Sequence, residues 1–212
     1  MIKLTGKEIE KKSFDIIDRK IPDGVYDEKQ RIIVRKVIHA TADFSIRKNL
    51  YFSEKAIDIG IENLKNNCDI YTDVMMVSSG ISPQYLDNYT GRIICTIRDE
   101  ETRKKSEEQN ITRASASVRV ALEKSDNIGI FAIGNAPTAL FEILEIAKEG
   151  KIKNNALIIG ACVGFVGARE SKEKLVESGL NFIVLRGRRG GSPIAATILN
   201  GLFYILKGGI VK

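Results

Sequence analysis

The chain contains a single histidine, His39, at the end of a stretch whose apolar residues repeat at helical spacing. Arg35 and Lys36 lie four and three residues earlier, which places them on the same side of a helix as His39. Imidazole, with an unperturbed pKa of about 6.5, suits proton transfer at neutral pH, and the two cations would attract an anionic ligand. Asp43, Thr41 or a carboxylate of that ligand could hydrogen-bond to the protonated ring. The spacing alone leaves His39 open between a structural residue and a general acid.

Three of the four prolines follow glycine-containing turns, and these turns have the composition of a strand end that leads into a helix. Free N–H groups at a helix N-terminus bind carboxylates or phosphates. Ordinary connecting loops have a similar composition, but the last turn also carries three arginines, so the sequence favours an anion-binding edge. The turns are Ser79-Gly80-Ile81-Ser82-Pro83, Gly134-Asn135-Ala136-Pro137 and Arg186-Gly187-Arg188-Arg189-Gly190-Gly191-Ser192-Pro193. The expected ligand contacts are Ser79, Gly80, Asn135, Arg188, Gly191 and Ser192, together with Lys36 and Thr41.

The elements that must position these residues alternate between strands and helices. Most of the strand-like runs are almost continuously apolar, which is typical of parallel strands covered on both faces. Strands are predicted at Thr72–Val77, Arg92–Ile97, Ile128–Ile133, Ala156–Val163 and Phe182–Leu185. Helices are predicted at Arg113–Lys124, Thr138–Lys148, Ser171–Ser178 and Ile194–Leu206. In such a sheet, ligands bind beyond the carboxyl ends of the strands.

Three further helical patterns precede this alternation. They cover Gly6–Ile21, Glu28–Ala40 and a segment from Ser53, the expected N-cap, to Asn66. No linker-like segment divides the chain, so one domain, residues 1–212, is expected. The predicted fold class is α/β: a single doubly wound, mainly parallel sheet with helices on both faces and a helical N-terminal arm, residues 1–66.

Composition limits the possible partners of this chain. Of its 212 residues, 43% are apolar, and the formal net charge is +6. Basic residues alternate with acidic ones, so an anionic ligand in a cleft is favoured over nucleic acid. No apolar run reaches the roughly 18 residues that a membrane span needs, and the N-terminus lacks the apolar segment of a signal peptide. The sequence therefore predicts a cytoplasmic protein without a membrane partner.

The cysteines and the late glycines do not indicate a cofactor. Cys68, Cys95 and Cys162 are odd in number and widely spaced, which argues against disulfides and zinc and favours free thiols; no metal site is expected. The glycines of the segment 160–167 do not match the G-x-G-x-x-G spacing of a dinucleotide-binding turn. A nicotinamide-dependent enzyme is therefore only a weak alternative.

Five strings in the sequence closely resemble the precorrin-8X methylmutase family, also called cobalt-precorrin-8 methylmutase, of cobalamin biosynthesis. They occur in the family's order and at matching separations, and the resemblance covers essentially the whole chain. The strings are Glu10–Ile17, Val37–Phe44, Gly134–Phe141, Val163–Lys172 and Arg186–Ser192.

The resemblance implies an isomerase that moves a methyl group from carbon 11 to carbon 12 of a polycarboxylate tetrapyrrole. The product would be hydrogenobyrinate or its cobalt form, and neither a redox cofactor nor a methyl donor is implied. The family's catalytic histidine falls on His39, and its substrate-contacting serine and arginine fall on Ser13 and Arg113. The resemblance also implies a homodimer whose active sites lie near the subunit interface.

Some positions depart from the family pattern, and two alternatives stay open. Cys162 stands where the family often has proline, Arg189 stands where an uncharged residue also occurs, and Ser13 could be an ordinary helix-surface residue. One alternative is a corrinoid-binding protein without catalysis, and the other is an NADP-linked oxidoreductase. The sequence leaves open whether the substrate carries cobalt.

Overall fold

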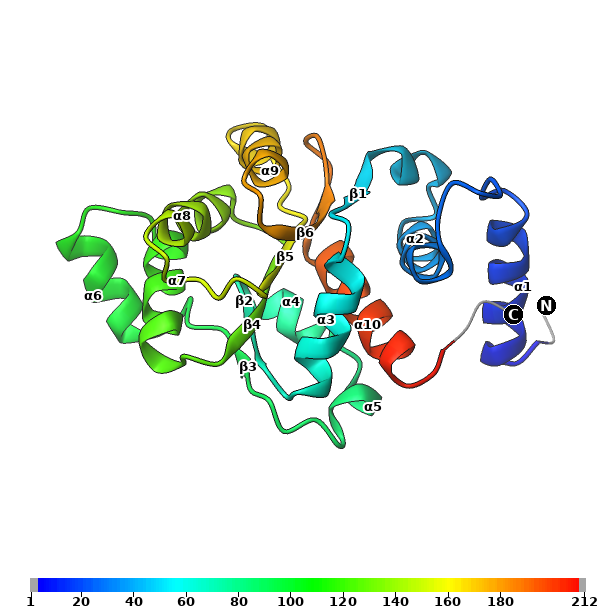
Figure 1. Ribbon diagram of the computed structural model, residues 1–212, viewed down its shortest axis with the longest axis horizontal. Helices are drawn as coiled ribbons and strands as arrows, with labels where there is room; N and C mark the ends of the chain where they lie inside the picture. The colour runs from blue at the N-terminus through cyan, green and yellow to red at the C-terminus, as the bar shows by residue number, and fades with distance from the viewer. Residues whose placement is uncertain (1–3, 210–212) are drawn as a thin grey trace.

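A six-stranded sheet forms the centre of this computed structural model, which describes residues 4–209 (Figure 1). The strands follow the order β1-β6-β5-β4-β2-β3; β1 is antiparallel to β6, and all other pairs are parallel. Their bounds are β1 (Leu50–Phe52), β2 (Asp69–Thr72), β3 (Ile93–Ile94), β4 (Ile128–Ile133), β5 (Leu157–Gly160) and β6 (Asn181–Leu185). The predicted mainly parallel sheet is confirmed.

Helices cover both faces of the sheet. Consecutive strand residues point to opposite faces, and both are buried. Ile158 belongs to one apolar cluster and Ile159 to the other. One cluster contains α2 (Glu28–Thr41), α3 (Ala56–Lys65), α4 (Met75–Ser79), α5 (Pro83–Leu86) and α10 (Ser192–Leu206). The other contains α7 (Arg113–Lys124), α8 (Pro137–Lys148) and α9 (Ala168–Glu177). The predicted helices on both faces are confirmed.

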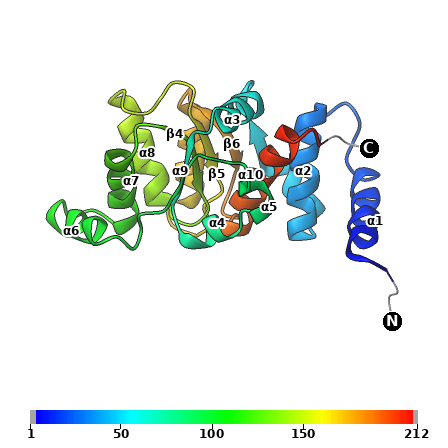
Figure 2. The ribbon, with the colours of Figure 1, turned by 90° about the horizontal axis from the view of Figure 1, so that it is seen from below.

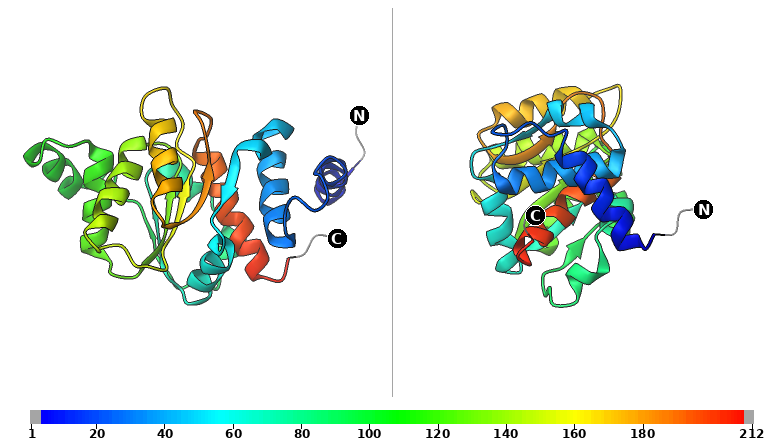
Figure 3. Two further views of the ribbon diagram at one scale, coloured as in Figure 1. Left: turned by 45° about the horizontal axis from the view of Figure 1, so that its top comes forward. Right: turned by 90° about the vertical axis from the view of Figure 1, so that its right-hand side faces the viewer.

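Two helices lie outside these layers. Helix α1 (Gly6–Asp18) packs on α2, and α6 (Glu100–Glu108) packs on α7. Figures 2 and 3 show them at opposite ends of the molecule. No helix within residues 4–209 combines the length and the hydropathy that a membrane crossing needs.

The predicted strand Thr72–Val77 is wrong. Strand β2 ends at Thr72, and the short helix α4 occupies residues 75–79. The strand begins with Asp69, whose carboxylate is buried. The Arg92 side chain neutralises this carboxylate, and the Ser125 hydroxyl donates a hydrogen bond to it. A charged residue at a buried strand position hides the strand from a hydrophobicity pattern.

The predicted helical arm, residues 1–66, is only partly helical. After α2, a 3₁₀ helix η1 (Phe44–Asn49) leads into β1, which forms one edge of the central sheet. Ser53 does not cap α3, because its hydroxyl accepts the N–H of Phe182 and the helix begins at Ala56. Three residues of edge strand are too short to produce a visible alternation.

Helix α6 was not predicted because it has no apolar stripe. Its only buried residue is Thr102, and Arg103 forms ion pairs with Glu100 and Glu107 on the helix surface. The predicted strand Arg92–Ile97 is also too long, because β3 comprises only Ile93–Ile94. The other predicted strands and helices agree with the observed ones to within a few residues at each end. The strand Ile128–Ile133 and the helix Arg113–Lys124 have the predicted bounds.

Candidate active site

The residues predicted to bind ligand lie mostly at the carboxyl edge of the parallel strands. The turns after β4, β5 and β6 open there, and so does the start of α7. The end of α2 reaches the same edge, because the following η1 segment joins the end of β6: the Arg186 N–H donates to the Asn49 carbonyl at 2.8 Å. The structure therefore brings the histidine segment and the glycine turns to one edge of the sheet.

His39 lies in the last turn of α2 with its side chain exposed. Its ring meets the ring of Phe14 from α1 edge to face, with 5.1 Å between the centroids. Phe14 also contacts a cation, since the Arg35 guanidinium lies 4.5 Å from the Phe14 ring centroid. Arg35 is buried and paired with Asp18 at 3.1 Å. Helix α1 thus holds one side of the imidazole and leaves the other accessible.

Lys36 and Ser13 flank this cluster but have partners within the protein. The Lys36 ammonium lies 4.4 Å from the Tyr204 ring centroid, and burial lowers the pKa of Lys36, an effect that the Glu10 carboxylate opposes. The Ser13 hydroxyl donates to the Ile9 carbonyl one turn earlier. Lys36 is half-buried and Ser13 is partly buried.

The two protein groups suggested as hydrogen-bond partners of a protonated His39 are engaged elsewhere. Thr41 donates its hydroxyl to the Val37 carbonyl at 2.8 Å. Asp43 accepts the Ser45 N–H and forms an ion pair with Arg189. A ligand carboxylate is the remaining suggested partner.

The glycine turns after β4 and β6 pack against each other. A Cβ added to Gly134 would lie 2.7 Å from the Ser192 Cα, so only glycine permits this approach. The prediction that Ser79 and Gly80 directly follow a strand is wrong. They lie at the end of α4. They meet the start of α10 around a shallow cavity of 420 Å³ lined by Met76, Ser79, Gly80, Pro193, Ala196 and Thr197.

Asp73, at the end of β2, is a site residue that sequence reasoning missed. Its fully buried carboxylate accepts the N–H groups of Gly134, Asn135 and Ala136 at 2.9, 2.8 and 2.7 Å. Burial raises the pKa of Asp73, and these three bonds oppose the rise. The N-terminus of α8 therefore already holds an anion from its own chain. The available signal was a carboxylate two residues after the apolar pair Ile70-Tyr71, separated from it by Thr72.

The turn after β6 presents three arginines with different partners. Arg186 pairs with Glu173 of α9. Arg189 reaches Asp43 and Ser45, in the segment that follows His39. Arg188 is exposed and beside the start of α10, whose N-cap Gly191 makes no side-chain capping bond. Arg188 and the α10 N-terminus are thus the available anion-binding groups of this turn.

Arg113 lies on the other face of the sheet from His39. It is the exposed first residue of α7, and the preceding Thr112 hydroxyl donates to the Thr138 hydroxyl of α8 at 2.9 Å. Helix α7 belongs to one apolar cluster and α2 to the other. Within one chain, the two residues share the carboxyl edge but are separated by the sheet.

Several large apolar side chains lie bare near this edge. Phe165 and Val166, in the turn after β5, are 88% and 90% exposed, and Met76 of α4 is 67% exposed. The two neighbouring apolar side chains Phe165 and Val166 are the kind of exposed surface that binds a ligand or another protein.

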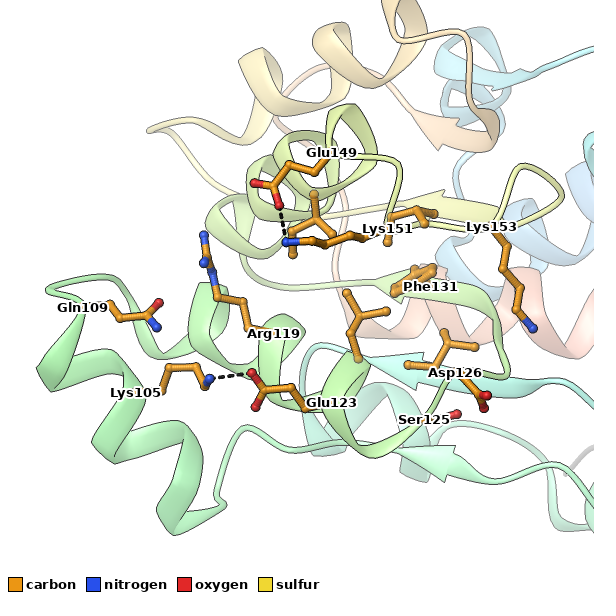
Figure 4. A pocket seen from close by; sticks show the side chains of 14 residues that line it. Lys105, Gln109, Arg119, Glu123, Ser125, Asp126, Phe131, Glu149, Lys151 and Lys153 are labelled. Atoms are coloured by element: carbon orange, nitrogen blue, oxygen red, sulfur yellow. Dashed lines mark hydrogen bonds and ion pairs between the residues drawn. The ribbon is translucent and has the colours of Figure 1, made fainter.

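A second cavity, of 490 Å³, lies at the opposite end of the sheet, between the starts of β4 and β5 (Figure 4). Its floor is apolar, and the charges on its rim pair with each other, as Lys105 does with Glu123 and Lys151 with Glu149. It contains none of the predicted site residues.

A doubly wound α/β domain with an accessible histidine and anion-binding turns at its carboxyl edge is typical of an enzyme that acts on an anionic small molecule. The family model described as precorrin-8X methylmutase (CbiC) matches residues 8–205. The chain belongs to this family and is an isomerase, a methylmutase of the kind that serves cobalamin biosynthesis.

Relatives match over nearly the full length of the chain. The cobalt-precorrin-8 methylmutase of Leptospira interrogans is 40% identical over 209 residues, which covers 94% of each protein. That of Priestia megaterium is 38% identical and covers 96% of this chain and 90% of its own. The solved structure of precorrin-8x methyl mutase from Thermus thermophilus has a TM-score of 0.87 at 31% identity, covering 98% of this chain and 100% of that one.

Proposed function

We propose that this protein moves the methyl group on carbon 11 of precorrin-8X, or of cobalt-precorrin-8, to carbon 12, with His39 as the general acid. The product would be hydrogenobyrinate or cobyrinate on the route to cobalamin. Family membership and the names of the relatives support the substrate class. The proposal keeps the expectation of a cytoplasmic enzyme.

The position of His39 is the observation that carries the proposed mechanism. Its ring is exposed at the carboxyl edge, and within residues 4–209 neither ring nitrogen has a hydrogen-bond partner. A protonated imidazole there can donate to a bound macrocycle, while Phe14 restricts its orientation. The methyl bond to carbon 11 breaks as the bond to carbon 12 forms, and the proton that His39 donates to the macrocycle returns to the imidazole before the next turnover. The reaction is an isomerisation and consumes no co-substrate.

The substrate's carboxylates require several separate anion-binding groups. We assign them to Arg188, Gly191 and Ser192 on the turn after β6, and to Arg113 on α7. Arginine binds a carboxylate through two parallel hydrogen bonds, which fixes orientation as well as charge. The remaining proposed contacts are Ser13, Lys36, Thr41, Ser79, Gly80 and Asn135.

We further propose that the enzyme is a homodimer. His39 and Arg113 lie on opposite faces of the sheet, and a second subunit would bring another Arg113 to the edge. The bare side chains of Phe165 and Val166 would then contact the macrocycle or the partner subunit. Sedimentation equilibrium tests this directly, and a mass equal to one chain at assay concentrations would refute it.

The test of function is an absorbance time course with purified protein and precorrin-8X. Because the methyl shift changes the conjugation, product appears as a new spectrum in the wild type. We expect His39→Ala to bind the tetrapyrrole but to lose turnover. Lys29→Ala, at the exposed opposite end of the same helix, serves as the matched control and should keep full activity.

Three results would change the proposal. Turnover by a folded His39→Ala protein would remove His39 from the mechanism. A wild-type spectrum that changes only in proportion to the protein added, with both the metal-free and the cobalt substrate, would identify a corrinoid-binding protein without catalysis. Saturable binding of NADP, with no effect of tetrapyrrole, would favour an oxidoreductase.

A further inference from the structure

Lys172 of α9 is a buried cation to which the proposed mechanism gives no role. Its side chain is fully buried, which is rare for lysine unless it is paired. The ammonium group donates to the backbone carbonyls of Cys162 and Arg189, each at 2.8 Å. Within the described residues it has no ion-pair partner, because the neighbouring Glu173 carboxylate pairs with Arg186.

The two carbonyls belong to the turns after β5 and after β6, which lie against each other. The Gly191 N–H donates to the Ala161 carbonyl at 2.7 Å, and the Gly164 N–H donates to the Arg188 carbonyl at 3.1 Å. A Cβ added to Gly190 would lie 2.2 Å from the Ala161 oxygen. We call this contact of residues 161–164 with residues 186–191 the turn contact; Lys172 is the side chain that bonds to both of its halves.

The turn contact positions groups that the proposed function assigns to the substrate carboxylates. On its outer side lie the exposed Arg188 and the start of α10 at Gly191. The Arg189 side chain extends from it to Asp43, in the segment that follows His39. A change in the turn contact would therefore move the anion-binding turn relative to the segment that ends at His39.

We propose that Lys172 is a positioning residue for substrate binding, whose ammonium group clamps the two turns together so that Arg188 and the α10 N-terminus meet the substrate carboxylates in a fixed geometry. This inference rests on the proposed function, since that function assigns the turn after β6 to carboxylates.

Burial of Lys172 has two opposite electrostatic consequences for this role. A buried positive charge without a counter-ion favours an anionic ligand at the adjacent surface. Burial lowers the pKa of Lys172, and the Cys162 thiol and the Glu173 carboxylate oppose that decrease.

The test compares KM and kcat of the wild type with those of Lys172→Met, which fills a similar volume without a donor. We expect KM to rise about tenfold, the scale of one lost charge-assisted hydrogen bond, with kcat kept within about twofold. Lys153→Met is the matched control, because this exposed lysine lies at the opposite end of the sheet and donates to the Asn127 side chain at 3.3 Å. Its KM should equal that of the wild type.

A second variant keeps the test valid if Lys172→Met does not fold. Gly190→Ala leaves Lys172 in place but forces the same two turns apart, so it should also raise KM and spare kcat. A lower melting temperature with unchanged KM in either folded variant would show a purely structural role and overturn the proposal. A loss of kcat alone would overturn it as well.

The same variants separate this inference from the proposed function. If the wild type shows no turnover, the proposed function fails, and the dissociation constant of hydrogenobyrinate replaces KM as the measured quantity. Weaker binding by Lys172→Met, about tenfold relative to the wild type, would still support the positioning role. Equal binding by both proteins would refute it.

Discussion

Asp73 shows how much a single buried residue can contribute to the geometry of the site. Its carboxylate accepts three backbone N–H groups at the start of α8, and it is fully buried. Asp73→Asn removes the charge and turns one acceptor oxygen into an NH₂ group that faces N–H donors. We expect the free energy of unfolding to fall by about 2–3 kcal/mol, measured by urea denaturation.

Asp87→Asn is the control for this substitution, since Asp87 is exposed at the end of α5. It should change the free energy of unfolding by less than about 0.5 kcal/mol. If Asp73→Asn were equally neutral, the N–H groups of the β4–α8 turn would not depend on the carboxylate. The turn would then be fixed by the packing of Gly134 against Ser192 alone.

Helix α1 packs on α2, and an ion pair with a buried partner joins the two helices. Asp18 bonds to the buried Arg35 at 3.1 Å, and the Asp18 carbonyl accepts from Arg31 at 2.7 Å. Asp18→Ala leaves the Arg35 charge buried without its partner, which costs about 3 kcal/mol. We expect α1 to detach, so that trypsin cleaves after Arg19 or Lys20 faster than in the wild type. Asp15→Ala, an exposed change on the same helix, should leave the cleavage rate unchanged; rapid cleavage of both variants would contradict the role of the pair.

The sequence predicted those elements whose signal is local. Strand Ile128–Ile133 and helix Arg113–Lys124 are strongly patterned, and both have the predicted bounds. The strand that begins at Asp69 lacks that pattern, because its buried carboxylate depends on Arg92 from elsewhere in the chain. The polar helix α6 lacks it because ion pairs on the helix surface contribute to its stability. The site residues likewise divide into those with a local sequence signal and those that only contacts between distant segments reveal. The composition of the turns indicated an anion-binding edge, but only the fold places the Asp73 carboxylate at the N-terminus of α8.

The charge of the whole molecule gives a prediction that does not depend on any single contact. The chain carries a net charge of +6, and Arg113 and Arg188 are exposed at the carboxyl edge. The screening length falls from roughly 14 Å at 0.05 M salt to about 4 Å at 0.5 M, so a polycarboxylate substrate is attracted less strongly at high salt. We expect KM to rise roughly fivefold over this range with kcat unchanged, because the attraction acts on binding and the methyl shift is internal to the substrate. Steady-state kinetics at both salt concentrations, with sucrose of equal osmolarity as the control, measure this effect. A constant KM would mean that the substrate's carboxylates meet no net positive field, and Arg113 and Arg188 would then lose their proposed roles.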